Sequence, residues 1–213
     1  MKECADIITG MNKDLKNIII GTSRRLFEQE GYGSVTMREI ADACGISVGN
    51  LTYYYHRKED ILMTIHDQIM NAFTDSIATE ERLQTGLSGY FAAEYAFMNY
   101  IIHDEALSSL YNQVINVPAL RSSYIQEHHD LFLSYVPSGR NDPLQSAATA
   151  AMSGMEFQLA DSGYLIRSFD DSMQSVFRCR CLFSERKLTK DAENQIQEGI
   201  LHGKQLAEHI RKI

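Results

Sequence analysis

The sequence contains few of the residues that mark non-globular chains, with 3 prolines, 13 glycines and 4 cysteines among 213 residues. This composition excludes a collagen-like or disordered chain and a small disulfide scaffold. Long apolar runs are also absent, since stretches such as residues 18–20 fall far short of the roughly 18 residues that a membrane-spanning helix needs. We therefore expect an ordinary globular protein with a hydrophobic core of its own and no membrane partner.

Two further features predict a cytoplasmic protein with reduced thiols. Residues 1–11 contain no apolar stretch followed by small residues, so a cleaved signal peptide is not expected. Cys179 and Cys181 lie two positions apart, a spacing that points to different sides of a helix, while Cys4 and Cys44 are far apart in the sequence. No pair has the spacing of a zinc site. We expect free structural thiols, no metal and no cofactor.

Positive charge is scarce, because 20 Lys and Arg stand against 28 Asp and Glu, a net charge of −8. An acidic protein repels nucleic acids, but the negative excess is unevenly distributed. Residues 1–64 carry 8 basic and 9 acidic residues, whereas residues 65–213 carry 12 and 19. The first segment is nearly neutral. It can bind phosphates if its cations face one way, because the repulsion decays over about one Debye length.

Apolar residues recur at helical spacing over almost the whole chain, and no alternating strand pattern is present. The sequence therefore predicts an all-α fold. A long helix is expected to begin near Lys58 and to connect two domains. The other predicted helices cover residues 12–30, 36–45, 48–54, 87–102, 118–137, 142–163, 170–185 and 189–213.

Residues 36–55 have the pattern of a helix-turn-helix. Thr36 is a predicted N-cap, and Glu39 three residues later completes a capping box. Gly45 suits the left-handed conformation that follows a helix end, and Ser47 is suited to cap the next short helix. In such a motif the second helix enters the major groove of DNA. Residues 48–54 are therefore the predicted recognition helix.

The sequence around this motif contains several family-specific features. Residues 18–36 read IIIGTSRRLFEQEGYGSVT, and residues 36–62 read TMREIADACGISVGNLTYYYHRKEDIL. Over residues 13–64 the chain strongly resembles the DNA-binding domain of the TetR family of bacterial transcriptional regulators. The matching positions include Leu26, Phe27, Gly31, Tyr32 and Thr36.

The resemblance implies an N-terminal three-helix, helix-turn-helix DNA-binding domain followed by a larger helical domain that dimerises and often holds a small molecule. We accordingly expect an N-terminal arm over residues 1–12 and a DNA-binding domain over residues 13–60, with the helix-turn-helix at residues 36–55. A ligand-binding and dimerisation domain is expected over residues 61–213.

The predicted recognition helix carries residues suited to reading bases. The Asn50 amide can donate and accept in a bidentate pair with adenine, and Val48 can touch a thymine methyl. Helix N-caps, tyrosine hydroxyls and a lysine suit phosphates, whereas an arginine suits either partner. The alternative is that the polar residues are solvated helix starts and the tyrosines a core edge or protein interface. The candidate DNA-binding residues are Thr36, Arg38, Ser47, Val48, Gly49, Asn50, Thr52, Tyr53, Tyr54 and Lys58.

The second domain has two candidate surfaces. Small residues recur between Leu144 and Leu159 and would let a partner helix approach closely, so this helix and either residues 173–183 or 196–210 are the predicted dimer interface. The alternative is an ordinary internal helix. Aromatic, methionine and histidine side chains line ligand sites but also fill helical cores. The candidate pocket residues are Phe91, Tyr95, Met98, Tyr124, His128, Phe132, Met152 and Met155.

Together these features predict a homodimeric, ligand-responsive repressor. It would bind a palindromic double-stranded DNA operator and leave it when an unidentified small-molecule effector binds. One alternative is a helix-turn-helix protein whose C-terminal domain docks a protein partner, and activation instead of repression also stays open. Enzymatic function is not expected. Adjacent His128 and His129 point about 100° apart on a helix, and no catalytic motif is present.

Overall fold

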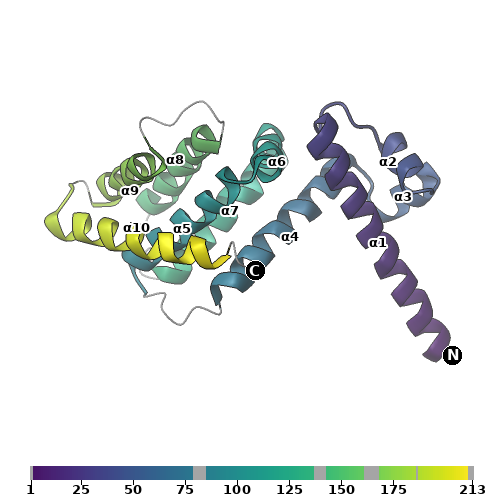
Figure 1. Ribbon diagram of the computed structural model, residues 1–213, viewed down its shortest axis with the longest axis horizontal. Coiled ribbons are helices and arrows are strands. Elements are labelled where there is room, and N and C mark those ends of the chain that lie inside the picture. Colours follow the sequence, from purple (N-terminus) through teal and green to yellow (C-terminus); the bar gives the residue numbers. More distant parts are fainter. Residues whose placement is uncertain (1, 79–84, 137–142, 161–167, 186, 211–213) are drawn as a thin grey trace. The chain divides into compact units, whose positions relative to one another are not determined.

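The computed structural model describes residues 2–78, 85–136, 143–160, 168–185 and 187–210. Within these ranges the regular secondary structure consists of ten α-helices and no strands, which confirms the predicted all-α class (Figure 1). The chain divides into two compact units, Met1–Met70 and Asn71–Ile213. This division lies within helix α4 (Lys58–Ala78), further along the chain than the predicted boundary at residue 60.

The first unit contains α1 (Lys2–Glu30), α2 (Met37–Ala43), α3 (Val48–Tyr54) and the first part of α4. Helix α1 begins at Lys2, whereas the sequence predicted a start near residue 12. The prediction used the apolar stripe that begins at Leu15. The turns of α1 before Leu15 do not continue this stripe, so the periodicity did not indicate them. The region expected to be an N-terminal arm is thus continuous with α1.

The core of the first unit forms where the four helices meet. The side chains of Ile19 and Phe27 from α1, Ile40 from α2, Leu51 from α3 and Leu62 from α4 are completely buried. Each fully buried apolar side chain of this size contributes about 1.5–3 kcal/mol relative to its exposed state. This core holds the short helices α2 and α3, which are too short to be stable alone.

The second unit is built around α5 (Leu87–Ile102), in which every residue from Ser88 to Asn99 is buried. Helix α5 contacts each of the five helices that follow it. Those helices are α6 (Glu105–Asn116), α7 (Pro118–Tyr135), α8 (Pro143–Ala160), α9 (Phe169–Glu185) and α10 (Lys190–Ile210).

Helix α6 is the one element that the sequence analysis did not assign. Its start is capped by Asp104, whose Oδ1 accepts a hydrogen bond of 3.0 Å from the backbone N–H of Leu107. Leu107, Leu110 and Val114 are buried at helical spacing along one face. An N-cap and an apolar stripe were therefore both present in the sequence as signals for this helix.

Helix α10 packs against α5 at very short range because two glycines lie at the contact (Figure 1). A Cβ atom added at Gly199 would lie 2.5 Å from the Cβ of Phe91 and 3.0 Å from the carbonyl oxygen of Ser88. A Cβ added at Gly203 would lie 2.7 Å from the Cβ of Tyr95. The apolar face of α10 is therefore used within the chain.

We expect Gly199→Ala to destabilise the protein by about 1–3 kcal/mol, because the new methyl group forces α5 and α10 apart. The measurement is the free energy of unfolding from urea titration followed by circular dichroism. Gly21→Ala is the matched control, since a Cβ at Gly21 in the interior of α1 meets nothing within 4 Å. That control should raise stability by up to about 1 kcal/mol through helix propensity. Equal effects of the two substitutions would contradict the packing described.

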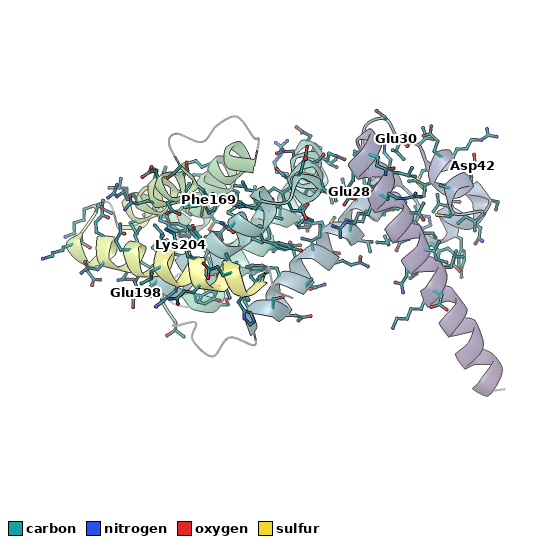
Figure 2. All side chains as sticks on the ribbon, viewed as in Figure 1. Glu28, Glu30, Asp42, Phe169, Glu198 and Lys204 are labelled. Carbon is teal, nitrogen blue, oxygen red and sulfur yellow. The ribbon has the colours of Figure 1, made fainter. Side chains whose placement is uncertain are left out.

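An ion pair with an additional hydrogen bond joins α5, α9 and α10. The Tyr95 hydroxyl donates a 2.6 Å hydrogen bond to Asp170, whose other carboxylate oxygen pairs with the ammonium of Lys204. The labels of Lys204 and Phe169 in Figure 2 mark the place of this ion pair, because Phe169 directly precedes Asp170. Desolvation raises the pKa of Asp170, but the hydrogen bonds from Lys204 and Tyr95 outweigh it and leave that pKa below its ordinary value.

The structure also bears on the expectations for the cysteines, the helix ends and membrane-spanning segments. Cys44, Cys179 and Cys181 are not joined by disulfides in the described part of the chain, whereas the side chain of Cys4 lies outside that part. The predicted ends of the helices at residues 137, 163 and 213 also lie outside the described residues. In the described part of the chain, no helix is both long enough and apolar enough to span a bilayer.

Candidate nucleic-acid interface and a buried polar cluster

The turn between α2 and α3 has the predicted geometry. Gly45 has a φ of +68°, in the left-handed region that side chains with a Cβ rarely adopt. The backbone N–H of Ile46 then bonds back to the carbonyl of Ala41 over 3.0 Å. These contacts redirect the chain sharply and bring α3 against α2 as the second helix of a helix-turn-helix.

The predicted capping box at the start of α2 is present. The Thr36 hydroxyl accepts a 3.2 Å hydrogen bond from the backbone N–H of Glu39, and the Glu39 carboxylate accepts from the Thr36 backbone N–H over 2.7 Å. The hydrogen bonds from the Thr36 backbone and hydroxyl lower the pKa of Glu39. Thr36 thus fixes the start of α2, and its hydroxyl is already engaged with Glu39.

The first turn of α3 is exposed on one side and anchored on the other. The Ser47 hydroxyl caps the helix by accepting a 3.1 Å hydrogen bond from the backbone N–H of Asn50. Val48, Gly49 and Asn50 are exposed, whereas Leu51 is completely buried. The Asn50 side chain is therefore presented to solvent from a helix whose orientation is held by the core.

The remaining predicted contact residues on these helices differ in accessibility. Arg38 is exposed, and Tyr53 has 76% of its surface exposed. Tyr54 is half-buried and packs edge-to-face against Tyr53, with the ring centroids 5.2 Å apart. The Thr52 hydroxyl donates a 3.1 Å hydrogen bond to the carbonyl of Gly49 within α3. Arg38 and Tyr53 thus have side chains reaching into solvent, and Thr52 has a local bond as well.

Lys58 has an intramolecular role that the sequence did not indicate. Its ammonium donates to the carbonyl oxygens of Tyr32, over 2.5 Å, and Val35, over 2.6 Å. It also lies 4.2 Å from the centre of the Tyr32 ring, a cation–π arrangement. Desolvation by burial lowers the pKa of Lys58. These contacts hold the loop between α1 and α2 against the start of α4.

An open groove of about 530 Å³ lies between α1 and the end of α3. We call it the tyrosine groove, and its lining residues are Lys16, Tyr53, Tyr54 and His56. The sequence analysis did not single out Lys16 or His56. Lys16 precedes Tyr53 by 37 positions in the sequence, so only the folded structure shows that both line one groove.

In the second unit, the structure separates the predicted pocket residues into two groups. Phe91 and Tyr95 lie on the side of α5 that packs against α10, and Phe91 stacks on Phe177 of α9 with centroids 4.4 Å apart. Met98 is completely buried, and Met155 is half-buried. The second set of candidates is buried around two ionisable side chains. This set consists of Tyr124, His128, Phe132 and Met152.

The two ionisable groups are the side chains of Glu94 and Arg180. We use the name buried polar cluster for Glu94, its neighbour His128 and Arg180, all of which are buried in the second unit. The Nδ1 atom of His128 lies 3.2 Å from a carboxylate oxygen of Glu94, and both side chains are at most 1% exposed. The His128 ring lies 3.9 Å from that of Tyr124 and 5.3 Å from that of Phe97. Two buried polar side chains need such close geometry, because burying either of them without a partner is expensive.

Arg180 lies on α9 and is completely buried. Its side chain contacts residues of α5, α7 and α8. Its guanidinium carbon lies 3.8 Å from the centre of the Phe132 ring and 4.8 Å from that of Tyr90. Its Nη1 donates to the hydroxyl of Thr149 and to the sulfur of Met152, each over 3.3 Å. The sequence analysis did not identify Arg180, because a lone arginine in a helix most often lies at the surface.

An exposed second helix on a helix-turn-helix, followed by a helical second unit, is an arrangement typical of DNA-binding regulators. Sequence comparison specifies the family that the first unit resembles. A model of the bacterial regulatory proteins of the tetR family matches residues 19–64. This match spans the helix-turn-helix and parts of the helices that flank it, so residues 19–64 are a DNA-binding segment of the tetR type.

Two relatives illustrate how the similarity is distributed. The biofilm operon icaADBC HTH-type negative transcriptional regulator IcaR of Staphylococcus epidermidis is 26% identical over 129 residues, covering 57% of this chain and 69% of IcaR. The uncharacterized HTH-type transcriptional regulator YuxN of Bacillus subtilis is 40% identical over 53 residues, covering 25% of this chain and only 18% of YuxN. The higher identity is thus confined to a short segment.

Solved structures share the fold at low identity. RolR in complex with resorcinol has a TM-score of 0.58 and 14% identity, covering 85% of this chain and 98% of RolR. The regulator SCO7518 of Streptomyces coelicolor A3(2) has a TM-score of 0.57 and 15% identity, covering 78% and 98%. The multidrug binding protein EbrR, complexed with malachite green, has a TM-score of 0.54 and 16% identity, covering 77% and 96%. These likenesses concern the fold.

Proposed function

We propose that this regulator is a homodimeric repressor that binds a palindromic operator and releases it when a small-molecule effector binds. The observation that carries the proposal is the first turn of α3, where Val48, Gly49 and Asn50 are exposed above the buried anchor Leu51. The description of IcaR as a negative regulator supports repression.

In this proposal residues 13–60, which follow the first turns of α1, bind DNA, and residues 61–213 dimerise and bind the effector. The side chains of Asn50 and Val48 contact base edges. Arg38 contacts a base or a phosphate. The other candidate residues contact the sugar-phosphate backbone and so fix the position of the protein on the DNA. Lys58 acts within the domain instead, because its ammonium is bonded to backbone carbonyls. The other candidate residues are Thr36, Ser47, Gly49, Thr52, Tyr53 and Tyr54.

The dimer is proposed to form through α8 and α9. Ala147, Ala150 and Gly154 are exposed along α8, so a partner helix can approach closely there. Leu182 and Phe183 on α9 are 47% and 49% exposed, which is unusual for large apolar side chains that have no partner. The apolar face of α10 already packs on α5, so α9 is favoured over α10 as the second helix of the interface.

The effector site is proposed to lie at the buried polar cluster. Aromatic rings with a few convergent polar groups are the usual lining of a small-molecule site. A chain of ring contacts leads from the cluster to α4, because Phe97 contacts both His128 and Phe73, the latter with centroids 5.1 Å apart. An effector that prefers one arrangement of these rings would shift α4, which continues into the first unit, and would thereby lower the affinity for DNA.

The test is selection of the purified protein against a randomised duplex DNA pool, with sedimentation of the complex formed on the selected sequence. We expect a palindrome bound by two copies of the chain, with half-sites about one or more helical turns apart. Selection of a non-palindromic site, or binding without sequence preference, would overturn the proposed mode of binding.

A second measurement addresses the effector. A small-molecule collection is screened for compounds that raise the melting temperature, and each hit is titrated against the protein–operator complex. We expect at least one hit to release the DNA, because a ligand that favours the free form must weaken operator binding in proportion. If every stabilising compound leaves the operator affinity unchanged, the effector mechanism is wrong and a protein partner becomes the better explanation.

A further inference from the structure

The tyrosine groove has the chemistry of an anion site. Its four lining side chains comprise one ammonium, one imidazole and two phenols, and none of them is acidic, although the chain as a whole carries a net charge of −8. Lys16 and His56 are both exposed, so their nitrogen atoms are accessible to a ligand from solvent.

The groove also lies in a fixed relation to the proposed base-reading residues. Tyr53 and Tyr54 are the last two residues of α3, and His56 follows directly after it, whereas Val48 and Asn50 lie in the first turn. A helix of this length is roughly 10 Å long. An occupant of the groove would therefore lie roughly 10 Å from the first turn, close enough to belong to the same DNA duplex that the first turn contacts.

We propose that the tyrosine groove binds one phosphodiester of the DNA backbone in each half-site. Lys16 supplies the ionic contact, and His56 together with the Tyr53 hydroxyl supplies hydrogen-bond donors. This inference rests on the proposed operator binding and adds Lys16 of α1 and His56 to the contact set. Lys16 supplies the first unit with a cation for phosphate, whereas the ammonium of Lys58 is bonded internally.

The test compares Lys16→Ala with the unaltered protein on the selected operator and on unrelated duplex DNA, each titrated with salt. Loss of one phosphate contact per protomer should reduce the slope of log affinity against log salt by about 1.8 for a dimer. Between 50 and 200 mM salt, the affinity of the unaltered protein should then fall about tenfold more than that of the variant. The ratio of operator to unrelated-DNA affinity should stay the same, because phosphate contacts carry no sequence information.

Arg25→Ala is the matched control. Arg25 is an exposed cation on the same helix, and nine residues of α-helix place it about 180° around α1 from Lys16. It should leave the salt slope unchanged, and Lys16→Arg should retain most of the unaltered slope. A slope that Lys16→Ala does not change, or that Arg25→Ala changes equally, would overturn the groove as a phosphate site. The proposed operator binding would survive that result, because it fails only if the unaltered protein selects no palindrome.

Discussion

Replacing Asn50 by alanine is expected to remove about 1–3 kcal/mol of discrimination at one base pair of each half-site. Both half-sites of a dimer are affected, so the total loss on a symmetrical operator is about 2–6 kcal/mol, or roughly 30-fold to more than 10⁴-fold in affinity. The physical reason is the loss of an exposed amide that can donate and accept at an adenine edge. The measurement is operator affinity at constant salt, followed by a repeated selection from the randomised pool.

The fold should tolerate this substitution. The contact between Asn50 and the Ser47 cap uses the backbone N–H, which alanine keeps, and the Asn50 side chain is exposed. Gln29→Ala removes an exposed amide from α1 in the same unit and should leave the affinity unaltered. If Asn50→Ala weakens binding to every DNA sequence by the same factor, Asn50 does not read a base.

Replacing His128 by alanine is expected to destabilise the second unit by about 3–5 kcal/mol. The substitution leaves the Glu94 carboxylate buried without the imidazole that lies 3.2 Å from it. It also removes a ring that packs against Tyr124 and Phe97. The free energy of unfolding is measured in urea by circular dichroism.

A double-mutant cycle separates the ionic contribution from the packing contribution. Glu94→Leu and His128→Leu are made singly and together, and we expect the double variant to be more stable than the sum of the single effects predicts. An apolar pair can replace a buried ion pair at little cost, whereas either single change leaves one polar group buried. The adjacent His129→Ala is the control. His129 is half-buried and makes one long contact of 3.4 Å to Thr149, so its replacement should cost much less. Strict additivity would contradict the coupling of Glu94 and His128.

The helix-turn-helix was predictable because its determinants are local. Thr36 with Glu39, and Ser47 with Asn50, are pairs three residues apart whose contacts form within one helical turn. Gly45 has the conformation that a tight turn requires. The fold class followed for the same reason, since helical periodicity and caps are properties of short segments.

The second unit was predictable as a set of helices but not as an arrangement. Phe91 and Tyr124 were expected to share a pocket, yet Phe91 faces α9 and α10 while Tyr124 belongs to the other group. Residues three or four apart share a helix face, but which neighbour covers that face depends on contacts between distant segments. Arg180 shows the limit most clearly, because its burial depends on side chains from α5, α7 and α8 together.

By itself, the sequence determined the helical class and the position of the helix-turn-helix, because short-range hydrogen bonds and periodicity specify them. The tertiary structure alone decided that Lys58 bonds internally, that Lys16 and Tyr53 line one groove, and that Glu94, His128 and Arg180 are all buried. Each of these depends on bringing together residues far apart in the chain. Such contacts form only when the cores of the two units are packed.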